Sequence, residues 1–244
     1  HAQSVTAPDE CIRTPAFPTG TVGAMCSLGM VPNAILTESF DQGFGAFTKD
    51  AVEGSGTNDI IMSTNGDTPS EGTGPETTAS CTGSSNKGEF AFLEGSSTLA
   101  GESHCMSRSV DLQSYESGPL ALSLWYHMFG RNIGELSVKV NGSPEFAISG
   151  EQQVANGQAW RQAIVNLDDH AGSIVDLQVC MTEGDGTVSI YESDISVDHV
   201  EVYGCGPEQF DLLSFMPAIL ATVERRPPPP PPPARWRITN EVVC

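Results

Sequence analysis

Basic residues are scarce in this sequence. Its 244 residues include 11 Lys and Arg against 31 Asp and Glu, which gives a formal net charge of −20 at pH 7. Proteins that bind nucleic acids or anionic membranes need basic patches, so the balance argues against both kinds of partner. An acidic surface of this kind favours solubility and permits cation binding.

Long apolar runs are also missing. The longest candidate, residues 210–223, is too short to span a bilayer and contains Pro217. We therefore expect no membrane insertion. The sequence begins at His1 without a hydrophobic leader, and we interpret it as a mature secreted chain whose signal peptide has been removed.

The common catalytic motifs are absent as well. The sequence has no HExxH or GxSxG, no phosphate-binding loop and no dinucleotide fingerprint. We therefore predict that the protein is not an enzyme. No CxxC or paired His/Cys spacing indicates a zinc site.

Seven cysteines are scattered along the chain. In an acidic chain rich in Gly, Ser and Thr, this pattern is typical of disulfides in an oxidising, extracellular compartment. Pairing between sequence neighbours predicts the bridges Cys11–Cys26, Cys81–Cys105 and Cys180–Cys205, which is one of 15 pairings that six cysteines allow. The seventh, Cys244, is then free or bonds another chain.

The sequence does contain many short stretches with period-two alternation. One stretch places Leu120, Leu122, Leu124 and Tyr126 on one face, and residues 136–140 repeat the pattern. Turn residues separate these stretches, and no internal repeat is visible. Such a sequence predicts an all-β fold, a two-sheet antiparallel jelly-roll sandwich.

One segment before this β region and one turn within it carry further predictions. Residues 1–35 contain several prolines and are predicted to be an irregular segment closed by the Cys11–Cys26 bridge. The segment Asn141-Gly142-Ser143 is a glycosylation sequon, and Asn-Gly is also the preferred pair for a type I′ hairpin turn. Both interpretations hold together, because a hairpin tip is exposed.

The composition changes near the C-terminal end. Residues 207–226 are expected to form a connector, and residues 227–244 a polyproline rod followed by a strand-like basic tail. A spacer is the usual role of a proline run. Here we favour an assembly arm. The residues that we expect to take part in assembly are Pro227, Pro230, Pro233, Trp236 and Cys244.

Several motifs in order resemble one family. Residues 125–130 read WYHMFG, followed by Gly134, Leu136 and Val138, and the stretches TPSEGTGPE, GEFAFLEGSS, WRQAIVNL and SDISVDHVEVYGC occur at the family's positions. Together they resemble the MAM family of extracellular adhesion domains, found in meprins, neuropilins and receptor tyrosine phosphatases. The resemblance covers about residues 36–206 and implies a jelly roll.

The family also suggests a metal site. Related jelly rolls hold a structural calcium between the first and last strands, and the matching acids here are Asp41, Asp50 and Asp198. Backbone carbonyls near Thr73 are further candidates. The closing strand of the family carries a pair of acids where this chain has Asp198-His199, and two family cysteines are missing, so its disulfide pattern does not transfer.

The resemblance implies a non-enzymatic extracellular structural or adhesion protein. The C-terminal arm adds the expectation that it assembles with other protein chains, including copies of itself, into a filament. The alternative is a lectin-like or other ligand-binding module of a cell-surface protein. Sugar sites need exposed aromatic side chains, and we expect Trp125 and Trp160 to be buried in strands. The WYHMFG motif of residues 125–130 also suggests that His127 is a packed structural residue.

Overall fold

The computed structural model describes residues 26, 30–50, 59–63, 66–75, 89–97, 100–116, 119–187 and 191–207. The chain divides into two units, His1–Pro207 and Glu208–Cys244, and every described residue belongs to the first. Apart from Pro207, the predicted connector and polyproline arm therefore lie outside the described residues, as do Cys11, Cys81 and Cys244.

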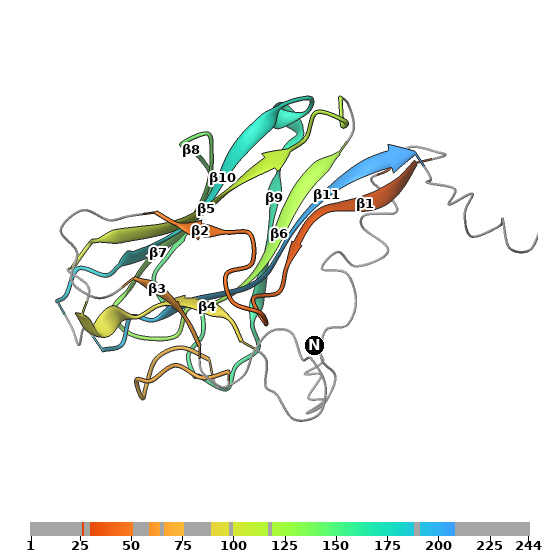
Figure 1. The fold of residues 1–244 in the computed structure, drawn as a ribbon. Coiled ribbons are helices and arrows are strands. Elements are labelled where there is room, and N and C mark those ends of the chain that lie inside the picture. Colours follow the sequence, from red (N-terminus) through yellow and green to blue (C-terminus); the bar gives the residue numbers. More distant parts are fainter. Residues whose placement is uncertain are drawn as a thin grey trace, which may run out of the picture. The chain divides into compact units, whose positions relative to one another are not determined.

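Two antiparallel sheets form the domain (Figure 1). The six-stranded sheet has the order β3-β4-β11-β6-β9, and β1 also pairs with β11. Its strands are β1 (Met30–Glu38), β3 (Ile60–Met62), β4 (Ala91–Leu93), β6 (Leu120–His127), β9 (Arg161–Asn166) and β11 (Ile195–Pro207).

The five-stranded sheet has the order β2-β5-β10-β7-β8. Its strands are β2 (Thr48–Lys49), β5 (Ser103–Asp111), β7 (Ile133–Val140), β8 (Ser143–Ser149) and β10 (Ile174–Glu183). Two 3₁₀-helices, Gly95–Ser97 and Asp168–His170, are the helical elements among the described residues, and neither is long enough to cross a membrane. The prediction of an all-β antiparallel jelly roll is confirmed.

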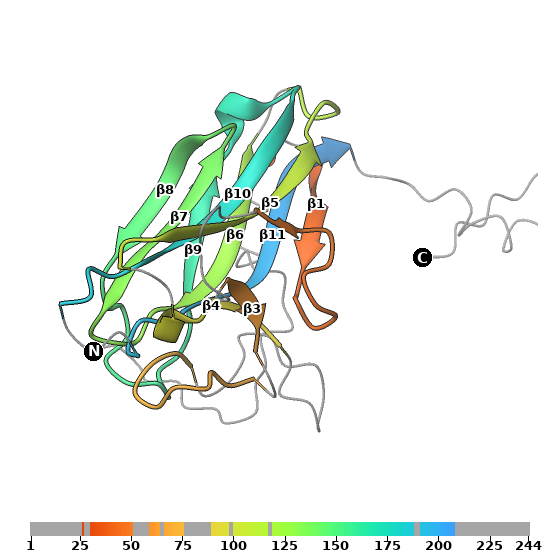
Figure 2. The same cartoon turned by 60° about the vertical axis from the view of Figure 1, so that its left-hand side comes forward.

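The first and last strands lie side by side, β1 beside β11 in both ribbon views (Figures 1 and 2). The expectation that residues 1–35 are irregular is wrong at its end, since β1 begins at Met30 and includes Pro32. A proline fits because β1 pairs with β11 alone among the described strands, so an edge strand can lack one donor.

The predicted disulfide pairing is wrong. The structure joins Cys26 to Cys205 across 179 residues, and Cys105 to Cys180 across 75 residues. In each case strand pairing brings distant cysteines together: Pro32 lies opposite Cys205, and Cys105 lies directly opposite Cys180. Sequence proximity was a poor guide because antiparallel pairing in a jelly roll joins segments far apart in the chain.

The main core lies between the two sheets. The predicted apolar faces of residues 120–126 and 136–140 are confirmed, since Leu122, Leu124, Leu136 and Val138 have no exposed surface and belong to one buried cluster. A smaller cluster forms from Phe90, Phe92 and Trp160, with Ile61 and Trp125 packed against it.

Candidate functional site

Asp198 lies in β11 where the strand is irregular. It is opposite Trp125 of β6, and the register shifts between Asp198 and Glu201. At this bulge His199 has a φ of 51°, and its backbone N–H donates to the Asp198 carboxylate at 2.7 Å. Asp198 itself has no exposed surface.

Asp41 approaches the same bulge from the start of the domain. Its carboxylate accepts a hydrogen bond from the backbone N–H of Glu89 at 3.3 Å. The pKa of His199 is raised by its hydrogen bond to Glu201, with further contributions from the charges of Asp198 and Asp41. The charges of Asp41 and Asp198 thus both act on one imidazole, which occupies the position of the family's second acid.

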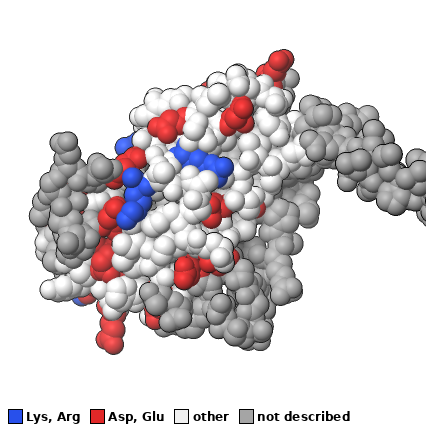
Figure 3. All heavy atoms as spheres, in the orientation of Figure 1, with Lys and Arg blue, Asp and Glu red and all other residues white. Residues whose placement is uncertain are grey.

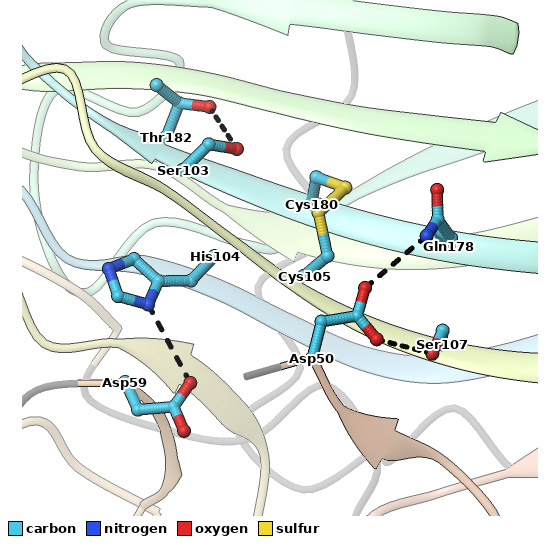
Figure 4. Close-up of a disulfide and its surroundings, with 9 residues drawn as sticks. All are labelled: Asp50, Asp59, Ser103, His104, Cys105, Ser107, Gln178, Cys180 and Thr182. Atoms are coloured by element: carbon cyan, nitrogen blue, oxygen red, sulfur yellow. Dashed lines mark hydrogen bonds and ion pairs between the residues drawn. A yellow bond between two sulfur atoms is a disulfide. The ribbon is translucent and has the colours of Figure 1, made fainter. Parts of the chain in front are cut away.

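Asp50 lies elsewhere, on the outer face of the five-stranded sheet (Figure 4). Its two carboxylate oxygens accept hydrogen bonds from Ser107 Oγ at 2.6 Å and from Gln178 Nε2 at 3.3 Å. Both donors are sheet residues, so this carboxylate has hydrogen-bond partners without a metal.

The described side chains do not complete a calcium site. Calcium takes six to eight oxygen ligands, whereas Asp41 and Asp198 are accompanied by the protonatable nitrogen of His199. In the part of the chain that the structure describes, no group of three or more His, Cys, Asp and Glu side chains is arranged to hold a metal ion. Calcium binding at these positions stays a prediction.

A row of cross-strand pairs ends at Asp50 (Figure 4). The Cys105–Cys180 disulfide lies between two opposed pairs, Ser103 with Thr182 and Ser107 with Gln178. Thr182 Oγ1 donates to Ser103 Oγ at 3.0 Å. A hydroxyl hydrogen bond, a disulfide and the hydrogen bonds to Asp50 thus follow one another along the same face of the sheet. Together they hold β2, β5 and β10 in register.

The sequon lies at the tip of the β7–β8 hairpin. Asn141 and Gly142 have φ values of 52° and 81°, as the predicted type I′ turn requires. Asn141 is exposed, and its side-chain Oδ1 accepts a hydrogen bond from the backbone N–H of Asp176 at 2.9 Å. The turn prediction is confirmed, whereas glycosylation of Asn141 stays a prediction.

A group of buried acids was not predicted. Asp194 has no exposed surface, and Glu94 and Glu183 are 9% and 2% exposed. The Asp194 carboxylate accepts a hydrogen bond from the backbone N–H of Gly95 at 3.1 Å. Burial raises the pKa of Asp194 to about 8, and the negative charges of Glu94 and Glu183 add to the effect.

Thr73 belongs to this acidic group and not to the bulge at Asp198. Its hydroxyl donates to the carbonyl of Phe129 at 3.0 Å and accepts from the backbone N–H of Asp194 at 2.9 Å. The Thr73 carbonyl accepts from the hydroxyl of Thr68. Asp194 and Glu94 occur in the motifs SDISVDHV and FLEGSS. Acids inside these family motifs were therefore the signal in the sequence from which this buried group could have been predicted.

His127 is a packed residue, as the motif suggests. Its side chain has no exposed surface, and its ring centroid lies 5.8 Å from that of Trp160. Burial lowers the pKa of His127 to about 4, against the opposing effect of the Gln158 and Asn156 carbonyls. A neutral, enclosed imidazole of this kind supports the smaller aromatic cluster.

The prediction that Trp125 and Trp160 are buried in strands is confirmed only for the burial of Trp160, which is 9% exposed. Trp125 is half-buried and contacts the edge of the same cluster. The assembly residues Pro227, Pro230, Pro233, Trp236 and Cys244 lie outside the described residues.

Two antiparallel sheets of this topology, with the Cys26–Cys205 bridge tying the segment before β1 to β11 within the six-stranded sheet, define a disulfide-linked jelly roll. Residues 39–206 match the family model described as "MAM domain, meprin/A5/mu". The chain therefore belongs to the MAM family, as its motifs suggest. MAM domains are extracellular modules that mediate interactions between proteins.

Solved structures of similar shape are more distant. They include TmCBM61 in complex with β-1,4-galactotriose, at 14% identity and a TM-score of 0.44, covering 70% of this chain and 99% of that one. A cyclase from Fischerella sp. TAU has 9% identity and a TM-score of 0.47, with coverage of 72% and 98%. At these values the likeness is no basis for assigning a ligand or a reaction to this chain.

Proposed function

We propose that this protein is a non-enzymatic extracellular structural or adhesion protein whose MAM domain and proline-rich arm mediate assembly. Membership of the MAM family over residues 39–206 is the observation that carries the proposal. The Cys26–Cys205 bridge supports an extracellular role, since it joins the beginning of the domain to its last strand and needs an oxidising compartment.

The arm is the segment of residues 224–244. It contains four of the chain's 11 basic residues and two acidic residues, so its own formal charge is +2 in a chain of −20. Seven consecutive prolines adopt polyproline II, which extends about 22 Å at ~3.1 Å per residue. The segment after them, with Trp236 as its anchor and Cys244 as a bridging thiol, binds a neighbouring copy.

Contacts of this head-to-tail kind build an open filament unless their rotation closes a ring. Sedimentation velocity over a range of concentrations tests the proposal on two chains, the full chain and one lacking residues 224–244. The full chain is expected to form larger species as its concentration rises, and the truncated chain to remain a folded monomer. A full chain that is monomeric throughout contradicts the proposal.

A carbohydrate-binding module is the second candidate, and the half-buried position of Trp125 favours it. Trp125 lies opposite Gln162 of β9, whose amide donates to Ser123 Oγ at 2.8 Å, so an aromatic ring and polar groups share this sheet face. A glycan array distinguishes the candidates: binding that is lost in Trp125→Ala supports the lectin, and no binding to any glycan removes it.

A further inference from the structure

Strand β8 has an edge that pairs with no described strand. It is the last strand of the five-stranded sheet, and Figure 2 shows it beyond β7 at the margin of the domain. Five of its seven residues are exposed and the other two are half-buried. An edge of this kind presents unpaired N–H and C=O groups, to which another strand can bind.

The protection of this edge is confined to its first half. Pro144 removes a donor, and a bulge between Val138 and Lys139 of β7 leaves the exposed Glu145 outside the regular pairing. Glu145 also forms an ion pair with His170, with 3.0 Å between Oε1 and Nε2. Prolines, charges and bulges are the usual means by which proteins prevent edge pairing.

The second half of β8 has none of these features. Phe146 and Ile148 pack against the main core and remain half-buried, opposite Val138 and Leu136 of β7. Ala147 alternates with them and is exposed on the outer face. An added strand would complete the burial of both apolar side chains and pair with the free backbone groups.

Figure 3 shows acidic and basic side chains distributed over one face of the domain. Near β8, the outer face of the five-stranded sheet carries an acid, Glu135. Glu135 of β7 lies opposite Ser149 and accepts a hydrogen bond from its hydroxyl at 3.2 Å. Lys139, four residues further along β7, is a basic side chain on the same face, near the bulge. The open half of the edge is therefore apolar on its inner face, and one acid, Glu135, lies beside it on the outer face.

The arm has the matching pattern. In the sequence ARWRITNEVV, Trp236, Ile238 and Val242 alternate with Arg235 and Arg237. If this segment is extended, the three apolar residues share one face with Asn240, and the two arginines share the other face with Thr239 and Glu241, so the basic charge lies at the beginning of the segment. A strand added beside β8 would lie about 10 Å from β7, two strand spacings away, within reach of a pair of long side chains such as Arg and Glu.

We propose that residues 235–242 of a second copy bind as an added strand along Phe146–Ser149 of β8. Trp236 and Ile238 extend the apolar face of Phe146 and Ile148, and the two arginines lie on the face of Glu135. The proposal rests on the proposed function, since it names the receiving surface for the arm. A run of seven prolines is a stiff spacer, and this stiffness disfavours folding the arm back onto the same chain.

The other long edge in the same margin, β9, serves as the control surface. It carries Arg161 at its start, which opposes a basic arm, and Ile164 on its outer face is 48% exposed. The test uses the full chain with Ala147→Lys in β8, Ile164→Lys in β9, and the arm change R235E/R237E. Ala147 and Ile164 are both exposed, so the two lysines are matched in charge and in setting.

Sedimentation velocity is expected to show association weakened at least ~10-fold by Ala147→Lys and by R235E/R237E, with Ile164→Lys unchanged. Combining Ala147→Lys with R235E/R237E is expected to restore part of the loss, because the charges again attract. Hydrogen exchange of the residue 146–149 amides is expected to slow as the concentration of the unmodified chain rises. Ser149→Lys replaces Ala147→Lys if the latter lowers the melting temperature.

The outcomes separate the two proposals. An unmodified chain that stays monomeric contradicts the proposed function. A chain that assembles equally well with Ala147→Lys and with Ile164→Lys contradicts the β8 site and leaves the arm's function standing. Cross-linking of a mixture of isotope-labelled and unlabelled chains shows whether the arm that binds β8 comes from the same chain or from a second copy. Cross-links between β8 and the arm that occur only within one chain would contradict binding by a second copy.

Discussion

The carboxyl group of Asp194 has no contact with solvent and lies near two other buried acids. Its pKa is about 8 in the folded protein, against 3.8 for the ordinary group. Between these pH values the folded protein holds a proton that the unfolded chain releases. Rising pH therefore lowers the free energy of unfolding across this range.

Asp194→Asn removes this titration, since an amide can still accept from Gly95 N–H without becoming charged. We expect the variant to lose less stability than the unmodified protein between pH 5 and pH 8, by at least ~1.4 kcal/mol, the equivalent of one pKa unit. Urea denaturation at several pH values measures this. The exposed Asp169→Asn is the control, and parallel profiles for all three proteins would contradict the prediction.

Asp198 allows a test of calcium binding that does not depend on which other residues are ligands. Binding to the native state alone raises stability by mass action. The calcium prediction expects a chelator to lower the melting temperature of the unmodified protein and to have no effect on Asp198→Ala. Identical melting curves of the unmodified protein with and without chelator would contradict calcium binding at this bulge.

At the scale of single elements, β7 and β10 approach each other closely at Gly134. A Cβ atom there would collide with the backbone carbonyl oxygens of Thr182 and Glu183, where the register of the two strands shifts. Gly134→Ala is therefore expected to lower the free energy of unfolding by roughly 1–3 kcal/mol, as other overpacked sites do. Chemical denaturation measures the change.

Gly142→Ala is the matched control for Gly134→Ala. Gly142 has open space around its Cβ position and a φ of 81°, so its substitution reports backbone strain without a collision. We expect a cost of about 1 kcal/mol, below that of Gly134→Ala. A larger cost at Gly142 than at Gly134 would mean that the close approach of β7 and β10 relaxes easily.

The strands were predictable because their pattern is local. The alternation of residues 120–126 places Leu122 and Leu124 in the core, and the pair Asn141-Gly142 specifies its own turn. Contacts between distant strands were not predictable in this way. Cys105 meets Cys180 because β5 and β10 are neighbours in the sheet, and that order depends on the whole topology.

The same distinction applies to the candidate site. Family motifs placed Asp41 and Asp198, and the structure brings both close to His199. Asp50 was assigned to the same site, but a short strand, β2, carries it to the other sheet. The buried group around Asp194 was missed because three acids that are distant in sequence gain a shared environment only in the folded domain.

At the scale of the whole molecule, the two disulfides between described cysteines close the domain over long distances. Cys26–Cys205 spans 179 residues and Cys105–Cys180 spans 75, so both greatly restrict the unfolded chain. Loss of a native bridge costs on the order of 2–5 kcal/mol, whereas the total stability of a domain is only ~5–15 kcal/mol. The pair thus accounts for a large share of the stability.

Reduction is therefore expected to lower the melting temperature by roughly 10 °C or more, at ~2–4 °C per kcal/mol for a chain of this size. Calorimetry with and without a dithiol reductant measures the shift. Double Cys→Ser variants separate the two bridges, and removal of Cys26–Cys205 is expected to cost slightly more because its loop is longer. Unchanged melting in reductant would show that strand pairing and the core hold the jelly roll without either bridge.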